Sequence, residues 1–344
     1  MWPAVSTQVT LPIKFSLEFN PLMNYLFYVL FFFSSFGISA STFDDWKLAL
    51  KKTLLASQIN PATIDIFIKH AKYDQVVYDI YNLQRKPLPL PLQKFLNQWF
   101  QAEDVSKSWI ATEGTRLLKE HKELLNRIEK KYQVDKTVII ALWGIESKYG
   151  KMTGKYPVLN SLSTLAYNSQ RKDFYTNELI HALKILQNNK INPEQFLGSW
   201  AGAIGQCQFM PSNYFVFGVD FDNNNKVDLF YSLADIFASI ANYLRKSQWK
   251  YKRPVGHLVT LPAQFNPHYL SYKSKNNFFW NKQKIRDHFQ KKLPALREKS
   301  HIITLIMEDR NYLVVYKNFD VILKWNRSYL FGLKIILLKT ALEG

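Results

Sequence analysis

The sequence contains a single cysteine, Cys207, among 344 residues. One cysteine cannot form a disulfide within the chain, and no cysteine–histidine pair or zinc-ligand spacing accompanies it. Both a disulfide-stabilised fold and a zinc-finger site are therefore excluded. The residues around Cys207 indicate a small buried side chain rather than a nucleophile.

Acidic residues are few compared with basic ones. The chain has 27 aspartates and glutamates against 45 lysines and arginines, which gives a formal net charge of +18. Such a charge favours an anionic partner, such as a nucleic acid, a lipid surface or an acidic polymer. The basic residues are mostly lysines spread along the whole chain, and no aromatic RNA-binding motif is present. We therefore expect no nucleic-acid partner.

Long hydrophobic runs are also scarce, with one exception near the N-terminus. Residues 25–36 are almost entirely apolar and are followed by small residues at 37–41. The run is shorter than the ~20 residues that usually span a bilayer, and it is typical of a signal peptide cleaved near Ala40. We expect residues 1–40 to be a signal peptide, or an N-terminal anchor if they are retained. The absence of a nearby cysteine excludes a lipoprotein anchor.

The chain as a whole has ample apolar material for a core, with 47% apolar and 15% aromatic residues. Apolar residues three and four apart predict that most of it is helical. The expected helices are 44–57, 60–70, 74–83, 92–100, 105–132, 135–149, 176–188 and 235–244. Near the C-terminus, β-branched and aromatic runs predict strands at 301–307, 312–316 and 321–323, before a helix at 328–342. The fold class is mainly α, of the α+β type, with a small antiparallel β element.

One carboxylate occupies an unusual position, at the end of a nearly apolar segment. Asp135 is a suitable N-cap residue for a helix and Gly150 is a residue that commonly ends one, and the helix predicted between them has almost no polar face. Glu146 is on the last turn, where apolar neighbours and the negative end of the helix dipole disfavour its charged form. A carboxyl that stays protonated near neutral pH can act as a general acid. The alternative is a glutamate that faces solvent or pairs with Lys148, and the local pattern does not decide between them.

A glycine-rich loop at residues 198–214 is the second distinctive segment. It combines three glycines with aromatic residues and with the polar side chains of Ser199, Gln206 and Gln208. This composition indicates backbone held close to a ligand. It is equally compatible with a helix start that packs closely on a neighbour.

Four segments occur in a distinctive order and spacing: Ala141–Gly150, Gly198–Ser212, Val219–Asp222 and Asn242–Leu244. Together they resemble the lytic murein transglycosylase B family, or glycoside hydrolase family 103. The resemblance extends from about Phe43 to the end of the chain and implies a lysozyme-like helical domain. It also implies cleavage of the β-1,4 bond between N-acetylmuramic acid and N-acetylglucosamine in peptidoglycan, without water, to leave 1,6-anhydromuramic ends.

The chemistry of this family agrees with the single carboxylate. Most glycosidases use two carboxylates, and this sequence offers one convincing candidate. The resemblance implies that Glu146 acts first as acid and then as base, with no cofactor for catalysis. Two alternatives stay open, a hydrolytic muramidase in which water attacks and an inactive peptidoglycan-binding protein.

The resemblance also implies a set of substrate-binding residues. These are Ser199, Gln208, Phe209, Arg171, Lys172, Tyr175, Trp325, Asn326 and Phe331. Ser199 would hold the N-acetyl group, and Arg171 would meet the acidic peptide stem. Lys172 replaces a second arginine, which weakens bidentate carboxylate binding. Trp325 and Phe331 replace tyrosines and so lack a hydroxyl.

The other members of this set are expected around the same cleft. The resemblance implies that Gln208, Phe209 and Tyr175 line it, and that Asn326 lies beside the catalytic acid. On this interpretation residues 41–344 form one catalytic domain. Its helical N-terminal part would be 41–132, its catalytic core 133–250 and its β-containing C-terminal part 251–344.

Residues 220–228 resemble the start of an EF-hand calcium loop. Ligand oxygens would come from the side chains of Asp220, Asp222, Asn224 and Asp228 and from the backbone of Lys226. The usual glycine is replaced by Asn225, which tolerates the left-handed turn. By analogy with the family, Asp235 would close the site. We expect a structural calcium ion, with a metal-free polar loop as the alternative.

The family resemblance also implies where and with what the protein works. It implies the periplasm of a Gram-negative bacterium, with the chain either secreted or attached through an uncleaved N-terminal segment. The expected partners are peptidoglycan glycan strands, and the expected state is a monomer.

Overall fold

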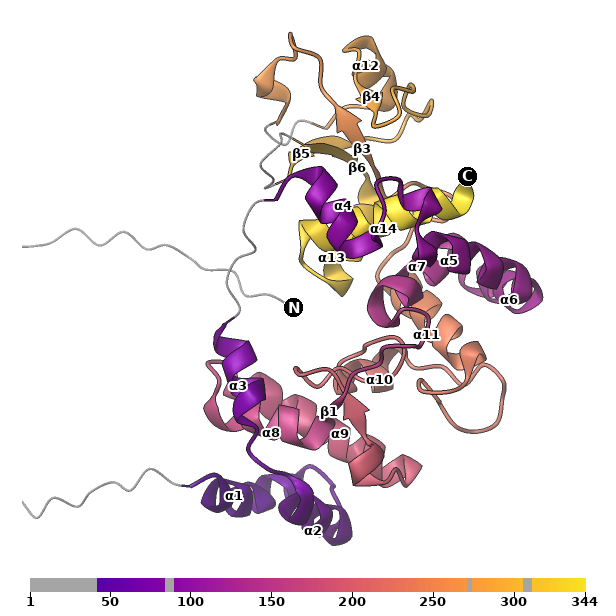
Figure 1. The fold of residues 1–344 in the computed structure, drawn as a ribbon. Coiled ribbons are helices and arrows are strands. Elements are labelled where there is room, and N and C mark those ends of the chain that lie inside the picture. Colours follow the sequence, from indigo (N-terminus) through magenta and orange to yellow (C-terminus); the bar gives the residue numbers. More distant parts are fainter. Residues whose placement is uncertain (1–41, 84–89, 271–273, 306–310) are drawn as a thin grey trace, which may run out of the picture.

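A computed structural model of the protein describes residues 42–83, 90–270, 274–305 and 311–344 (Figure 1). The predicted signal peptide or anchor at residues 1–40 lies outside these ranges. Within them, no helix is both long enough and apolar enough to cross a membrane.

The N-terminal helices are confirmed at nearly their predicted bounds. They are α1 (Phe43–Ala56), α2 (Pro61–His70), α3 (Gln75–Asn82) and α4 (Leu92–Phe100). The first three begin at side-chain caps, because Thr42, Asn60 and Asp74 each accept a hydrogen bond from a backbone amide of the first turn. Helices α1–α3 lie beside α8 (Val158–Asn168) and α9 (Lys172–Asn189), whereas α4 lies at the other side of the molecule (Figure 1).

The single helix predicted at 105–132 is wrong. The segment forms a short 3₁₀ helix, η1 (Val105–Lys107), followed by α5 (Trp109–Glu120) and α6 (Lys122–Tyr132). The hydroxyl of Ser108 caps α5, and His121 breaks the helical dihedrals between α5 and α6. Each piece keeps its own buried apolar face, so the apolar spacing continues across both breaks and does not reveal them.

The predicted buried helix forms α7 (Lys136–Ser147) at the centre of the molecule. It packs against α5, α6, α11 (Leu233–Lys246) and the C-terminal helix α14 (Tyr329–Glu343). Asp135 stands before its first residue but does not cap it. The Asp135 carboxylate instead accepts hydrogen bonds from Trp249 Nε1 at 3.0 Å and from the Lys252 amide at 3.2 Å. This carboxylate therefore connects the start of α7 to the chain that follows α11.

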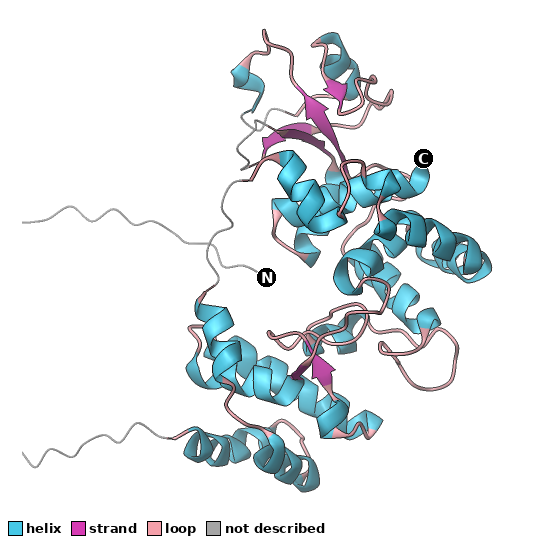
Figure 2. Ribbon diagram, in the orientation of Figure 1, coloured by secondary structure: helices cyan, strands magenta, loops and turns pink. Residues whose placement is uncertain are grey.

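The C-terminal part contains a four-stranded antiparallel sheet, ordered β4-β3-β6-β5. Figure 1 labels these strands, and Figure 2 shows them in magenta in the upper part of the molecule. Its strands are β3 (Gly256–Thr260), β4 (Arg286–Asp287), β5 (His301–Thr304) and β6 (Tyr312–Val315). One face of the sheet forms a small second core with Trp280 of α12 (Asn277–Lys282). The mainly helical fold with a small antiparallel β element is thus as predicted, although β3 and β4 were not foreseen.

The strand predicted at 321–323 is wrong, because these residues lie in α13 (Lys317–Trp325). Phe319 and Ile322, three residues apart, are both buried on one helical face, and Lys317 pairs with Asp320 one turn away. Helical spacing therefore outweighs the β-branched composition. The following helix, α14, begins where predicted, with the Ser328 hydroxyl as its cap.

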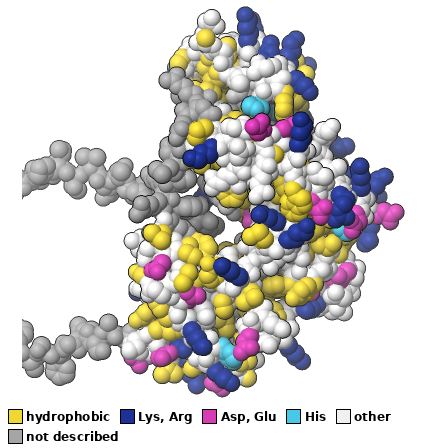
Figure 3. Space-filling view, in the orientation of Figure 1, with side chains coloured by type: hydrophobic (Ala, Val, Ile, Leu, Met, Phe, Trp, Pro, Cys, Tyr) yellow, Lys and Arg dark blue, Asp and Glu magenta, His cyan; other side chains and the backbone are white. Residues whose placement is uncertain are grey.

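Basic side chains are dispersed over the surface. Lysines and arginines occur over both halves of the face shown in Figure 3 rather than in one patch. This distribution agrees with the scattered lysines of the sequence.

Candidate active site

Glu146 lies on the last turn of α7 and faces the end of α13. Its Oε1 accepts a hydrogen bond of 2.6 Å from Trp325 Nε1. The residue is partly buried, whereas Lys148, with φ +48°, ends the helix and is exposed. Glu146 is therefore directed towards another part of the fold and not towards solvent.

The surroundings of Glu146 favour its protonated form. Burial raises the pKa of this carboxyl from 4.5 to about 7, against the opposing effects of the Trp325 hydrogen bond and the positive charge of Lys334. None of the groups that shift this pKa is a second carboxylate. A carboxyl with this pKa can both donate and accept a proton near neutral pH.

An aromatic cluster fixes Trp325 in contact with Glu146. The Trp325 ring lies 4.6 Å from the ring of Tyr243 and 5.3 Å from that of Phe209, between centroids. The Tyr243 hydroxyl also donates to the Lys324 carbonyl, next to Trp325. Phe209 is only 2% exposed, so in this structure its visible role is to support Trp325. That Phe209 contacts the substrate stays a prediction.

The glycine-rich loop is held in a compact conformation next to this cluster. It starts from β2 (Leu197–Gly198), which pairs with β1 (Tyr156–Pro157), and ends at α10 (Pro211–Phe217). The Ser199 Oγ accepts from the amides of Ala201 and Ala203, which leaves the hydroxyl proton for another acceptor. Gln208 has φ +49°, and its side-chain amide donates to the carbonyls of Thr153 and Gly205. Only the Gln208 Oε1 is then available to a ligand.

Two residues of the loop are structural. Gln206 accepts from Trp143 Nε1 at 2.8 Å and donates to the Phe230 carbonyl at 2.7 Å, so its amide connects α7 to the loop. Gly150, with φ +82°, leaves no room for a side chain beside that amide. Cys207 is fully buried, as predicted, and burial raises the pKa of its thiol. A neutral, inaccessible thiol is not a nucleophile.

The predicted binding residues Arg171, Lys172 and Tyr175 lie at the start of α9, below α7 in Figure 1. The Arg171 guanidinium lies 4.0 Å from the centroid of the Phe174 ring and 5.8 Å from that of Tyr175. Lys172 is exposed, and Tyr175 is buried. The binding roles of Arg171, Lys172 and Tyr175 therefore stay predictions.

The remaining predicted residues follow Trp325. Asn326 Oδ1 accepts from the Ser328 amide at 3.1 Å, so it shapes the turn between α13 and α14. Phe331 is buried on the first turn of α14. Three residues further along the helix is Lys334, whose charge lowers the pKa of Glu146 and which was not predicted from the sequence. The available signal was that Lys334 is the only charged residue between positions 330 and 338.

The predicted calcium loop gathers three carboxylates. One carboxylate oxygen each from Asp220, Asp222 and Asp235 lies within 4.8 Å of the others. Asp235 is completely buried and accepts from the amides of Phe221 and Asp228, both at 2.8 Å. Burial also raises the pKa of Asp235, because its charge is poorly solvated.

The other predicted ligands shape the loop. Asn225 has φ +65°, which confirms the predicted left-handed turn. Asn224 Oδ1 accepts from the Lys226 amide, and Asp228 Oδ1 accepts from the amides of Phe230 and Tyr231. These bonds fold the chain around the three carboxylates without neutralising them. Several oxygen ligands this close together suit a divalent cation such as calcium, which prefers oxygen ligands.

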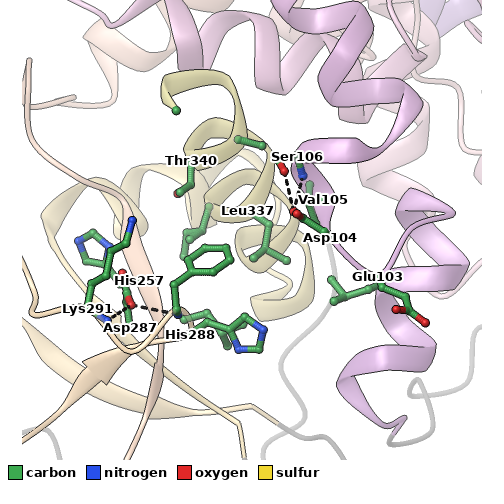
Figure 4. A pocket seen from close by; sticks show the side chains of 16 residues that line it. Glu103, Asp104, Val105, Ser106, His257, Asp287, His288, Lys291, Leu337 and Thr340 are labelled. Atoms are coloured by element: carbon green, nitrogen blue, oxygen red, sulfur yellow. Dashed lines mark hydrogen bonds between the residues drawn. The ribbon is translucent and has the colours of Figure 1, made fainter.

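A pocket of about 440 Å³ lies elsewhere, between η1, β3 and α14 (Figure 4). It contains none of the predicted site residues. None of its aspartate or glutamate side chains has the environment of a general acid. Glu103 is exposed, Asp104 accepts from the Ser106 amide and hydroxyl, and Asp287 accepts from the amides of Phe289 and Lys291. We therefore place the candidate active site at Glu146.

Comparison with known proteins agrees with this location. Residues 42–340 match the family model described as a transglycosylase SLT domain. The chain is 32% identical to SltB3 of Pseudomonas aeruginosa. The two structures have a TM-score of 0.79, and the match covers 88% of this chain and 80% of SltB3. SltB3 has been crystallised with NAG-NAM-pentapeptide and with NAG-anhNAM-pentapeptide. SltB1 of the same organism shares the fold, with 22% identity and a TM-score of 0.71 over 87% of this chain and 97% of that one.

A curated relative is the membrane-bound lytic murein transglycosylase B of Escherichia coli (strain K12). It is 32% identical over 137 residues, which are 40% of this chain and 38% of that protein. These matches confirm the resemblance predicted from the sequence. With a family model that covers residues 42–340 and a shared fold, the chain belongs to the transglycosylase SLT domain family.

Proposed function

We propose that this protein is a lytic transglycosylase, which cleaves the bond between N-acetylmuramic acid and N-acetylglucosamine in peptidoglycan and forms 1,6-anhydromuramic ends. The observation that carries the proposal is the partly buried Glu146 carboxyl, with its pKa raised to about 7 and with no second carboxylate among the groups that act on it. The SltB3 complexes with saccharide-peptide ligands support the same substrate class.

The reaction needs only this carboxyl and groups of the substrate. Protonated Glu146 donates its proton to the glycosidic oxygen as the bond from that oxygen to C1 of N-acetylmuramic acid breaks. The N-acetyl carbonyl oxygen of the same sugar then bonds to C1. The Glu146 carboxylate next removes the proton of the C6 hydroxyl, whose oxygen displaces the carbonyl oxygen from C1. Glu146 ends the cycle protonated, and no water is consumed.

The proposed subsites follow from the surroundings of Glu146. Trp325 orients the carboxylate through its 2.6 Å hydrogen bond. We infer that the free hydroxyl proton of Ser199 is donated to the N-acetyl group and that Gln208 Oε1 accepts from a sugar hydroxyl. Arg171 and Lys172 would bind the acidic peptide stem from the α9 side. Tyr175, Asn326, Phe209 and Phe331 would complete the walls of the cleft.

Digestion of purified sacculi, followed by mass spectrometry of the released muropeptides, tests this function. A lytic transglycosylase releases products that are lighter by one water than those of a hydrolytic muramidase. Anhydro ends are the expected result. Hydrated ends would support the muramidase, and no release at any pH would support an inactive peptidoglycan-binding protein.

We also propose that calcium binds at Asp220, Asp222 and Asp235, with Asn224, Asp228 and the Lys226 carbonyl completing the loop. The three clustered carboxylates support this, because like charges so close together repel unless a cation lies between them. Slt35 of Escherichia coli has been crystallised with calcium, but at 20% identity it shows only the shared fold. The role of the ion would be structural, since the reaction requires no cofactor.

Calcium should therefore raise the melting temperature. An ion present at about 100 times its Kd stabilises the folded chain by about 2.7 kcal/mol. We expect a chelator to lower the melting temperature of the parent protein and of the control variant Asp173→Asn, whose side chain is exposed on α9. Asp222→Asn should lose most of the response. If the chelator leaves the parent unchanged, the loop is a metal-free polar turn.

We further infer that the protein works in the periplasm of a Gram-negative bacterium, because its proposed substrate is found there. Residues 1–40 would direct it there as a signal peptide or hold it as an uncleaved anchor. Residues 41–344 would act as a monomeric catalytic domain, with the division at 132 and 250 proposed from the sequence.

A further inference from the structure

Lys334 is a buried cation that the reaction described above does not use. It lies on α14 and is 8% exposed. Its Nζ is 3.3 Å from the centroid of the Trp99 ring, which comes from α4, and 5.6 Å from that of Phe331. Within the described ranges, no carboxylate lies at ion-pair distance from it and no carbonyl accepts from it. Burial of an ammonium without such partners is costly.

Two interactions offset this cost. The face of an aromatic ring attracts a cation, and the short distance to Trp99 makes this contact strong. The second is electrostatic attraction to Glu146. Helices α7 and α14 pack against each other, and the Thr137 hydroxyl at the start of α7 donates to the Glu343 carboxylate at the end of α14, so the two helices run antiparallel. Glu146 is nine positions after Thr137 (146 − 137) and Lys334 is nine positions before Glu343 (343 − 334), which brings the two charges to the same level of the helix pair. Burial lowers the pKa of Lys334 to about 8, while the charge of Glu146 opposes this change. Each group favours the charged form of the other.

The other charged or titratable groups around α7 do not replace Lys334. Cys207, from the glycine-rich loop, is neutral. On α5, Glu113 pairs with Arg116, and on α6, Glu129 lies 4.0 Å from Lys136 at the opposite end of α7. On α11, Tyr243 donates to a backbone carbonyl. Lys334 is thus the one cation among the described residues that acts on Glu146.

We propose that Lys334, held against Trp99, is a positioning residue whose ammonium stabilises the Glu146 carboxylate after that carboxyl has donated its proton. This inference rests on the proposed function and deepens it. The second half of the reaction needs Glu146 as a base in a poorly solvated site. A fixed cation nearby supplies the stabilisation that water would otherwise give. Without it, Glu146 would retain its proton to higher pH.

The same helix provides a matched control. Lys339, five residues further along, is also 8% exposed, but it forms an ion pair with Glu343 and does not act on Glu146. Lys334→Met and Lys339→Met therefore remove the same charge from the same helix at equal burial. A purely structural role for buried lysines predicts similar effects of the two substitutions.

The test is the pH dependence of muropeptide release. Lys334→Met should raise the pKa of Glu146, so that Glu146 stays protonated to higher pH. The pH at which activity falls on the alkaline side should then rise by about one unit. Lys339→Met should keep the parent profile, and Lys334→Arg, which retains the charge, should stay close to it. Lys334→Gln replaces the methionine variant if that variant does not fold.

An unchanged alkaline limb in a folded Lys334→Met or Lys334→Gln protein would overturn the inference. So would an equal shift in Lys339→Met. A failure of this inference can be distinguished from a failure of the proposed function. If Glu146→Gln is inactive while the Lys334 variants keep the parent profile, the catalytic assignment stands and only the role of Lys334 is wrong.

Discussion

Glu146→Gln should lower the release of anhydro-muropeptides by at least about 100-fold. Glutamine keeps the shape of the side chain, but it can neither protonate the glycosidic oxygen nor take a proton from the C6 hydroxyl. Both halves of the reaction therefore lose their proton transfer. Release is measured by chromatography of sacculus digests, and zymography gives an independent check.

Glu123→Gln is the control for this loss. Glu123 is an exposed residue of α6, so the same substitution there should leave the activity within error of the parent. Digestion by Glu146→Gln at the parent rate would show that another group provides the acid and would refute the assignment.

The melting temperature of Glu146→Gln separates a loss of catalysis from a loss of fold. The pKa of Glu146 is raised from 4.5 to about 7 in the folded protein, so between these values the folded chain holds a proton that the unfolded chain has released. The stability of the parent therefore falls as pH rises through this window. Glutamine has no such dependence, so the variant should gain stability relative to the parent at about pH 8 and show no such gain at about pH 4.

Gly154→Ala should strongly lower the free energy of unfolding of the protein. Gly154 has φ +108°, and a Cβ at this position would lie 2.0 Å from the backbone carbon and oxygen of Gly198. Neither backbone can move without disturbing the pairing of β1 with β2. We expect a loss of about 3 kcal/mol or more in the free energy of unfolding, measured by urea denaturation.

This substitution should also lower activity, because the displaced residues lead directly to Ser199. Lys155→Ala is the comparison, since it changes an exposed neighbour with ordinary backbone geometry. If Gly154→Ala unfolds within about 0.5 kcal/mol of the parent, the two segments do not approach so closely in solution.

The sequence predicted the parts of the site that depend on local patterns. The apolar spacing from Val138 to Ile145 is enough to bury α7 and to leave Glu146 at its end. The oxygen-rich pattern at 220–228 is enough to indicate a turn of backbone that gathers carboxylates, and Asn225 takes the predicted left-handed conformation. These features involve residues close together in the chain, where helix and turn geometry fix the spacing.

Sequence alone determined that a lone carboxyl ends a buried helix, but tertiary structure decided what surrounds it. The Trp325 hydrogen bond joins residues 179 positions apart, and the Lys334 ammonium comes to the level of Glu146 only because α14 packs on α7. Two of the wrong predictions had local signals that were outweighed: the Ser108 hydroxyl caps α5, and Phe319 and Ile322 have helical spacing. Periodicity specifies which face of an element is buried, whereas its partner is chosen by the packing of the whole chain.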